Sequence, residues 1–329
     1  MNGSVVASQF PSKPPSSNGG SGSSYANMPV TKVPDWYVTI AWDALFNGMA
    51  TGLFMAAAVS ELAAPAVFVP VAKVAYPVAL ALLLIDLGML VLDLGDPLRF
   101  HHMLRVFKPY SPMSVGTWCL TIFSLPLTAA ATLSLLAEIG IDLEWARTLA
   151  VVAGLLPALG SAAYKGVLLS TNAQPGWKDA RWMGAYLTNS ALLMGCAEFL
   201  VLSALMKQTQ AIAILRIAFI LLLVLNVIPL GLLFANLKPT HARLYPREQQ
   251  WRAGICIFTV GMLIPLVLTL INNGLLFTCS AAVFLLLGSW LIRFVYVKIP
   301  HRSPLESQTP GQPRDLINPV TQKNEPLES

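Results

Sequence analysis

Three acidic residues and one lysine lie within long apolar segments, near the segment ends that we expect on one side of a membrane: Asp43, Asp86, Asp93 and Lys165. A charged side chain at the centre of a spanning helix costs roughly 2.5–3.5 kcal/mol on insertion scales, so such residues normally face a protein interior or wet cavity. Carboxylates held there can take up and release protons. We therefore predict a proton relay formed by Asp43, Asp86, Asp93 and Lys165. Alternatively, these residues only join helices, or Lys165 extends to the interface.

The first apolar segment carries a polar stripe. Thr39, Asp43 and Asn47 are spaced by four residues and therefore share one face of a helix. Gly48 and Gly52 follow, a spacing of small residues that permits a close helix neighbour. The stripe predicts a binding surface for a polar group, although hydrogen bonding between helices would explain Asn47 equally well.

A smaller polar set is expected at the other side of the membrane. Glu198 lies two-thirds of the way along the fifth apolar segment, and Arg216 lies in the early turns of the sixth. At similar depth the two can form a salt bridge, which we predict as structural. The alternative is an exit for protons that enter or leave near Asp43.

The elements that position these residues are membrane-spanning helices. The chain has 329 residues, of which 55% are hydrophobic and 11% charged, with a mean hydropathy of +0.64. This composition excludes a soluble globule of this size and predicts an all-α integral membrane protein. With about 20 apolar residues per crossing, we expect eight helices, arranged as two four-helix bundles, over residues 36–60, 71–94, 113–137, 146–169, 182–206, 210–235, 251–271 and 274–297.

Two polar tails flank this membrane domain. Residues 1–33 contain Pro, Ser and Gly without an apolar periodicity or the hydrophobic region of a signal peptide, and residues 299–329 are again polar and rich in Pro. We expect both tails to be disordered, and residues 34–298 to form the eight-helix domain.

An even number of spans places both termini on one side, here named side A, together with the loops after spans two, four and six. Side B, the opposite side, holds only four of the 21 Lys and Arg: Lys73, Arg147, Lys207 and Arg216. Because cytoplasmic loops retain Lys and Arg, side A is predicted to be cytoplasmic in a bacterial inner membrane. The pI of about 9.1 reflects this bias and does not argue for nucleic acid.

Several chemistries are not supported by the sequence. The four histidines are expected in loops or tails, so the paired intramembrane ligands of a haem are missing, and the four cysteines are solitary within their spans, without the spacing of cluster ligands: His101, His102, His241 and His301; Cys119, Cys196, Cys256 and Cys279. We expect no haem, iron–sulfur cluster or other metal in this chain. Neither a P-loop nor a G-x-S-x-G motif is present.

Two local motifs resemble a known family. Residues 93–100 read D-L-G-D-P-L-R-F, and residues 111–118 read S-P-M-S-V-G-T-W. Residues 163–170, A-Y-K-G-V-L-L-S, are similar to a Y-T-G-x-L-L-S element but depart from it at Lys165. With eight spans, these motifs resemble the NrfD/PsrC family, the quinone-reacting membrane subunits of polysulfide reductase-like complexes.

The resemblance implies a site and partners. It places Thr39, Asp43 and Tyr164 around a quinone, menaquinone or ubiquinone, although Thr39 and Asp43 stand where relatives can carry Asn and His. It also implies a ferredoxin-like iron–sulfur subunit and a catalytic, molybdopterin-containing subunit. The chain would be a subunit of a respiratory oxidoreductase complex outside its catalytic core. A docking surface is expected in the loop after span two, at Asp96, Arg99, His101, His102, Arg105 and Lys108. That loop could instead be an ordinary positive cytoplasmic loop.

One tension and two rival functions stay open at this point. Many relatives present the docking face to the periplasm, whereas the Lys and Arg distribution puts it in the cytoplasm. A proton-coupled secondary transporter is the first rival, because prolines at positions 77, 126, 157, 229 and 265 could break helices. A passive anchor of a redox complex is the second, and it predicts no quinone binding.

Overall fold

The computed structural model describes residues 38–94, 96–171, 176–272 and 274–301. These residues form helices and turns, with no β-strand among them, which confirms the all-α prediction. The predicted tails fall largely outside the described residues. The exception is a short 3-10 helix, η3 (Ile299–His301), whose Ile299 is buried.

Among the described residues, eight helical segments are long and apolar enough to cross a membrane, as the sequence predicted. Seven of them are single α-helices: α1 (Val38–Ala63), α2 (Pro65–Leu92), α3 (Pro112–Glu138), α4 (Glu144–Ser170), α5 (Met183–Leu205), α6 (Thr209–Leu244) and α9 (Leu275–Val297). The seventh crossing is composite and consists of α7 (Arg247–Phe258), a π-helical segment η2 (Thr259–Leu263) and α8 (Ile264–Ile271). A 3-10 helix, η1 (Pro97–Leu104), lies between α2 and α3.

Local chemistry explains several helix ends. The Ser111 hydroxyl accepts a hydrogen bond from the Ser114 amide, and Pro112 occupies the first position of α3, where its missing N–H costs nothing. Tyr245 is extended because it precedes Pro246, so α6 ends there. The helix continues past residue 235, where the sequence prediction ended the span, because apolar length measures the hydrocarbon core and not the helix. His241, predicted in a loop, therefore belongs to α6.

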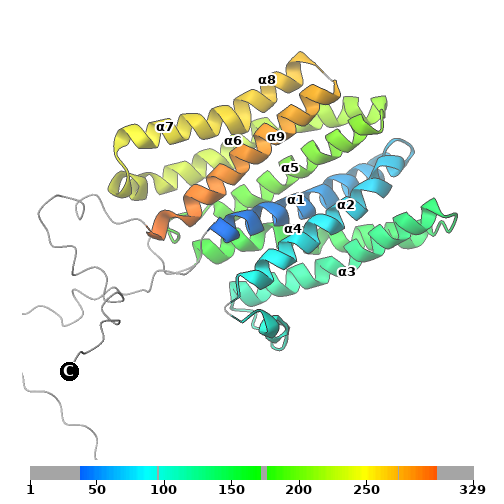
Figure 1. Ribbon diagram of the computed structural model, residues 1–329, viewed down its shortest axis with the longest axis horizontal. Coiled ribbons are helices and arrows are strands. Elements are labelled where there is room, and N and C mark those ends of the chain that lie inside the picture. The colour runs from blue at the N-terminus through cyan, green and yellow to red at the C-terminus, as the bar shows by residue number, and fades with distance from the viewer. Residues whose placement is uncertain (1–37, 95, 172–175, 273, 302–329) are drawn as a thin grey trace, which may run out of the picture. The chain divides into compact units, whose positions relative to one another are not determined.

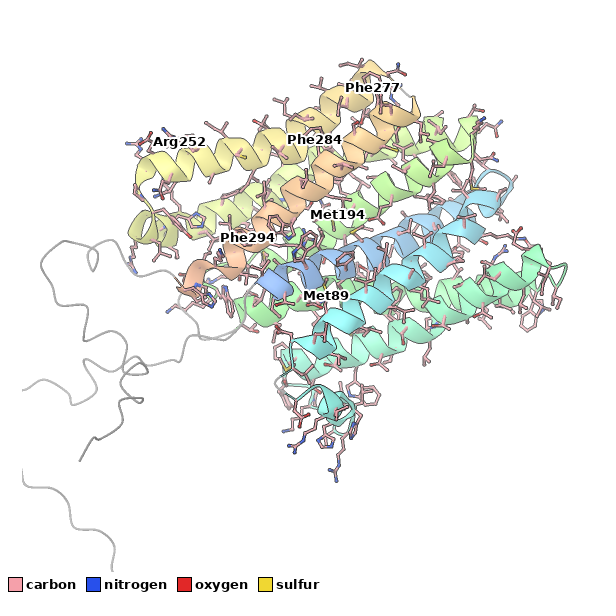
Figure 2. The ribbon with its side chains drawn as sticks, in the orientation of Figure 1. Met89, Met194, Arg252, Phe277, Phe284 and Phe294 are labelled. Carbon is pink, nitrogen blue, oxygen red and sulfur yellow. The ribbon has the colours of Figure 1, made fainter. Side chains whose placement is uncertain are left out.

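The helices form two groups that meet at α5. Helices α1 to α4 pack on one another, and α5, α6, α8 and α9 form the second group, with α5 and α9 also packing against α1 (Figure 1). The glycines of the first span permit this closeness, as expected. A Cβ on Gly52 would lie 1.9 Å from the Ala191 carbonyl oxygen of α5, and Gly195 faces Gly52 in return. Met194 of α5 lies in the middle of the helices (Figure 2), next to Gly48.

Prolines do not interrupt most of the spans. Helices α2, α3, α4 and α6 continue through Pro77, Pro126, Pro157 and Pro229. Of the crossings in the described part of the chain, only the seventh departs from α-helical geometry, in η2 just before Pro265. A proline cannot donate to the carbonyl four residues earlier, which favours such a local widening.

The loop between α4 and α5 is attached to α9. The Trp177 indole donates to the Tyr296 carbonyl at 3.0 Å, and the Tyr296 hydroxyl donates to the Trp177 carbonyl at 3.2 Å. Both side chains are buried. These reciprocal bonds hold the side-A ends of α4, α5 and α9 together.

Candidate functional site

A cavity of about 280 Å³ opens near side A, between the first four spans. Its lining comes from the first turns of α1 and α3 and the last turns of α2 and α4: Ile40, Asp43, Ala44, Leu90, Asp93, Leu94, Met113, Thr117, Tyr164, Lys165, Leu168 and Leu169. The volume is near the lower end of the roughly 300–1,000 Å³ typical of small-molecule sites. An apolar wall with a few polar groups is the usual construction of such a site.

Lys165 joins three spans in the wall of this cavity. Its ammonium lies 2.8 Å from Asp43 Oδ2 and 2.6 Å from Asp86 Oδ1, and it donates to the Asp43 backbone carbonyl at 3.0 Å. Two of these contacts, to Asp86 Oδ1 and to the Asp43 carbonyl, are hydrogen bonds, and the contact with Asp43 Oδ2 is an ion pair. Lys165 therefore does not extend to the interface, and it organises two carboxylates.

Both carboxylate oxygens of Asp86 accept hydrogen bonds, and the side chain is fully buried. Oδ1 accepts from Lys165, and Oδ2 accepts from the Asn47 amide at 3.2 Å. Asn47 also donates to the Ser161 hydroxyl at 3.1 Å, which links α1, α2 and α4. Asp86 is not part of the cavity lining. Its geometry is that of a group that positions Lys165.

Asp43 differs from Asp86 because it lines the cavity and has an unused acceptor. Asp43 Oδ2 pairs with Lys165, whereas Oδ1 is buried and accepts no hydrogen bond within the described part of the chain. With Asp43, Asp86 and Lys165 all ionised, the cluster carries a net charge of −1, and binding one proton makes it neutral. A low-dielectric site favours the neutral form, so this cluster is suited to holding one exchangeable proton.

Tyr164 packs beside the same cluster. Its ring lies against Gly116 of α3, where a Cβ would come within 1.9 Å of Tyr164 Cδ2. The Lys165 ammonium is 5.7 Å from the ring centroid. The glycine of the S-P-M-S-V-G-T-W motif thus makes room for the tyrosine of the fourth span.

Thr39 and Asp93 lie at the outer end of the site. Thr39 is exposed and lies outside the cavity lining, and its hydroxyl interacts with the Asp93 carboxylate. Asp93 follows the last residue of α2 and lines the cavity. Partial burial raises the pKa of the Asp93 carboxyl above its usual value of 3.8, and the hydrogen bond from Thr39 opposes that rise.

The predicted pair between Glu198 and Arg216 does not form, and that prediction was wrong. Arg216 instead donates to the backbone carbonyls of Thr269 and Leu270, at 2.9 and 3.0 Å. Both carboxyl oxygens of Glu198 are buried without a hydrogen-bond partner in the described residues. The two side chains share a depth, but they leave their helices in different directions.

Arg293, a buried cation near side A, was not predicted from the sequence. The Arg293 side chain is 1% exposed and donates to the Ala44 carbonyl of α1 at 3.3 Å and to the Ser289 carbonyl at 3.0 Å. The carbonyls of Asp43 and Ala44, neighbours in sequence, therefore each accept from a cation of another helix. Its position in the sequence, about one turn before the end of an apolar span, could have indicated a buried cation.

A second buried cluster, near side B, was also missed. Arg147 Nη2 lies 3.0 Å from Glu61 Oε1, and the Tyr76 hydroxyl donates to Glu61 Oε2 at 2.5 Å. Both charged side chains are buried. Glu61 and Arg147 occur at the side-B ends of spans one and four, a depth match that the sequence already contained.

The predicted docking loop lies beside the cavity. Asp96 and Arg99 form an exposed salt bridge of 2.9 Å, and the rings of His101 and His102 are in edge contact. Arg105 and Lys108 are exposed as well. The loop connects α2, which ends next to Asp93, with α3, which begins next to Met113, so its charged surface adjoins the lining of the cavity.

Among the described residues, no group of three or more His, Cys, Asp or Glu could hold a metal ion. No curated protein matches the sequence. Residues 31–303 match the family model described as polysulfide reductase of the NrfD type, whose members are membrane subunits of quinone-linked redox complexes. Because the match covers most of the chain and all eight spans, the protein belongs to the polysulfide reductase NrfD family.

Proposed function

We propose that this subunit exchanges electrons and protons between the membrane quinone pool and an iron–sulfur partner, at the cavity near side A. The observation that carries the proposal is that Asp43 and Tyr164, from two different spans, line one apolar cavity beside a buried charge cluster. The NrfD family interacts with quinones in general, which agrees with this chemistry.

Hydrogen-bond accounting assigns the roles of the polar groups. The Lys165 ammonium is already engaged by Asp43 and Asp86 and also interacts with Tyr164, so we assign ligand binding to other groups. Asp43 Oδ1 is the free acceptor, and the Tyr164 hydroxyl is the donor in the lining. A quinol hydroxyl would donate to Asp43, and a quinone carbonyl would accept from Tyr164.

Exchange of two electrons with a quinone requires exchange of two protons, so the site needs a route to water. Asp43 can hold one proton of the cluster, and Asp93 lies between the cavity and the end of the span. We assign Asp43 and Asp93 to proton exchange. Asp86 and Lys165 position the Asp43 carboxylate, and Thr39 acts on the site only through Asp93.

Electrons must leave or enter through another subunit. Members of this family partner with iron–sulfur and catalytic subunits. We propose that a ferredoxin-like subunit docks on the loop after α2, at the exposed Asp96, Arg99, His101, His102 and Arg105, and connects to a molybdopterin-containing subunit. Docking there would place the partner next to the end of the cavity formed by Asp93 and Leu94.

The distribution of Lys and Arg supports a cytoplasmic position for side A. A reporter fused to the carboxyl terminus of the full chain tests this orientation. Alkaline phosphatase activity of that fusion would place side A in the periplasm and would reverse our assignment.

Binding of the fluorescent quinol analogue heptyl-hydroxyquinoline N-oxide to the purified complex tests the site. Tyr164→Phe keeps the ring against Gly116 and removes only the hydroxyl, so we expect about tenfold weaker binding, equivalent to about 1.4 kcal/mol. Tyr110→Phe, at an exposed tyrosine outside the cavity, is the matched control and should bind as the wild type does. Equal affinities of the Tyr164→Phe variant and the wild type would refute the assignment. A passive anchor would not bind the analogue at all.

A further inference from the structure

A groove lies between α6 and the seventh crossing, which run side by side (Figure 1). It has a volume of about 220 Å³, and its lining is apolar: Val227, Leu230, Gly231, Phe234, Gly254, Ile257, Phe258 and Met262. None of these residues lines the cavity near side A. A Cβ added to Gly231 of α6 or to Gly254 of α7 would meet nothing within 4 Å, so the two helices leave this space open.

The groove opens toward the lipid. Val227 and Phe258, one from each wall, are 46% and 48% exposed, and both belong to membrane-spanning segments. Water does not fill such a space, because the hydrocarbon core contains none. A void would lose dispersion contacts along its whole lining. The occupant of the groove must therefore carry an apolar chain.

The turn that joins α6 to α7, at the side-A end of the groove, is strongly basic. Residues 238–252 contain four cations and one acid: Lys238, Arg243, Arg247, Arg252 and Glu248. Arg252, at the end of α7 next to this turn (Figure 2), pairs with Glu248. The other three cations are exposed and pair with no carboxylate among the described residues. The turn thus presents uncompensated positive charge.

Two of these cations continue the walls of the groove. Lys238 is four residues after Phe234 and seven after Gly231, so it extends the groove-lining face of α6 toward side A. Arg247 is seven residues before Gly254 and extends the corresponding face of α7 in the same direction. The side-A end of the groove therefore lies between a lysine and an arginine.

The same cations mark the edge of the hydrocarbon core. On α6, Lys238 is the first charged residue after Arg216, and on the seventh crossing Arg252 is the last charged residue before the apolar stretch that ends at Ile271. Polar head groups begin where the apolar length of the helices ends. The phosphate of a lipid whose chain enters the groove would lie at this level.

We propose that the groove binds an anionic phospholipid, with one acyl chain between α6 and α7 and the phosphate at Lys238 and Arg247. The negative charge of the head group complements the unpaired cations, and the chain fills the apolar space. A zwitterionic lipid offers the same chain without the net charge, so the two cations select for the head group. This site does not depend on the proposed quinone chemistry, because the groove and the quinone cavity share no residue.

Photolabelling of the purified complex tests where the chain lies. The complex is reconstituted in phosphatidylcholine nanodiscs that contain a trace of phosphatidylglycerol with a diazirine in its acyl chain. Light releases N₂ from the diazirine, and the carbene that forms inserts into a neighbouring side chain. We expect mass spectrometry to find adducts on the groove residues of α6 and α7. No adduct there, the result expected if a helix of another subunit covers the groove, would overturn the proposal.

A second probe tests the head group. Phosphatidylcholine with the same diazirine chain is used at the same mole fraction. Each Lys or Arg near a membrane surface contributes about 1 kcal/mol to the attraction of anionic lipid, a factor of about five. Two cations should therefore favour labelling by phosphatidylglycerol about twenty-fivefold at low occupancy. Equal labelling by the two probes would mean that any lipid occupies the groove, and it would overturn the proposal.

Charge variants test the role of the two cations. Lys238→Gln/Arg247→Gln should bring the labelling of the groove by the two probes close to equality. Arg105→Gln/Lys108→Gln removes the same charge from the exposed loop before α3 and is the matched control, which should keep the preference. A preference that survives the first double variant, or that both double variants lose equally, would overturn the assignment of the phosphate to Lys238 and Arg247.

Variants that fill the groove test the chain independently of charge. Gly231→Leu fills it from α6 and Gly254→Leu from α7, and both should fold because their Cβ atoms meet nothing within 4 Å. Each should strongly reduce labelling of the opposite wall. Gly88→Leu, on α2 and equally open, is the matched control and should label as the wild type does. Labelling of the groove at the wild-type level in both groove variants would show that the chain lies elsewhere and would overturn the proposal.

Discussion

The Lys165 ammonium contacts Asp43 twice, at 2.8 Å to the carboxylate Oδ2 and at 3.0 Å to the backbone carbonyl. The two contacts fix the Asp43 side chain relative to its own helix and leave Oδ1 without a partner among the residues that the structure describes. Because the third contact of Lys165 goes to Asp86, one ammonium on α4 holds α1 and α2 together. A residue that departs from the related family motif thus shapes the site.

The two carboxylates of this cluster should differ in function although they share Lys165. Asp43→Asn and Asp86→Asn each remove one negative charge, and each leaves Lys165 a single carboxylate partner, so both variants should fold. Only Asp43 lines the cavity. A positioned proton acceptor contributes roughly a hundredfold or more to rate. We therefore expect a loss of this size in quinone-linked turnover of the purified complex for Asp43→Asn.

Asp86→Asn serves as the matched control and should lose much less turnover. Its amide can still accept a hydrogen bond from Lys165 through the oxygen atom. Equal losses in the two variants would mean that the cluster acts as a structural unit and that Asp43 has no separate role. Complex assembly, followed by size-exclusion chromatography, verifies that both variants are intact.

The contact between Gly116 and Tyr164 gives a prediction that does not alter any polar group. Gly116→Ala would place a Cβ 1.9 Å from Tyr164 Cδ2, so the ring must move out of its position. We expect weaker binding of heptyl-hydroxyquinoline N-oxide, comparable to that of Tyr164→Phe.

Gly88→Ala provides the comparison, because a Cβ at Gly88 of α2 meets nothing within 4 Å. It should preserve binding and add up to about 1 kcal/mol of helix stability. If Gly116→Ala bound the analogue as tightly as Gly88→Ala, the position of the Tyr164 ring would not matter to the site.

The sequence was sufficient to predict that three of the charged residues lie at one level. Apolar length predicted eight spans, and position within a span placed Asp43, Asp86 and Lys165 at one level, where the structure brings them together. Depth does not determine the direction in which a side chain leaves its helix. For that reason the depth match of Glu198 with Arg216 predicted a pair that does not exist.

Two other differences between the sequence prediction and the structure have separate physical causes. Thr39 shares a helical face with Asp43, but it is only the second residue of α1, where it is exposed and does not belong to the lining of the cavity. Arg293 was not recognised because its partners, two backbone carbonyls and the Ser190 hydroxyl, form no motif that a sequence reveals. Contacts of this kind require coordinates.

Asp93 should make stability depend on pH. Burial raises the pKa of its carboxyl in the folded protein above the usual 3.8, so the folded state binds the proton more tightly than the unfolded chain. Stability contributed by Asp93 is therefore full below 3.8 and decreases as the pH rises through the folded-state pKa. Asp93→Asn removes this loss, and its advantage in thermal unfolding should grow from acidic to neutral pH.

Thr39→Val provides the companion test. Without the hydroxyl that stabilises the ionised carboxylate, the pKa of Asp93 should rise further, and the loss of stability should extend to higher pH. Wild type and Asp93→Asn with parallel pH profiles would contradict the assignment.

The Glu61–Arg147 pair near side B should contribute to stability far more than its exposed neighbour, Lys73–Asp142. Side-chain exposures are 2% and 6% in the first pair but 19% and 51% in the second, at similar distances of 3.0 and 3.1 Å. Removing one partner of a buried pair leaves an uncompensated charge and costs about 3–5 kcal/mol, whereas an exposed pair contributes about 0–1 kcal/mol. Arg147→Met should therefore lower the unfolding temperature strongly, and Lys73→Met only slightly.

The double variant Glu61→Gln/Arg147→Met tests whether the stability lost in Arg147→Met comes from the missing pair or from the unpaired charge that remains on Glu61. If the cost of Arg147→Met arises from the unpaired Glu61 carboxylate, neutralising Glu61 should restore part of the lost stability, because Tyr76 can still donate to the amide oxygen. Thermal unfolding of the purified complex, followed by the exposure of the buried thiol of Cys196, measures all four proteins. A double variant that is less stable than Arg147→Met would show that Glu61 is stabilised by Tyr76 alone and that Arg147 contributes through packing.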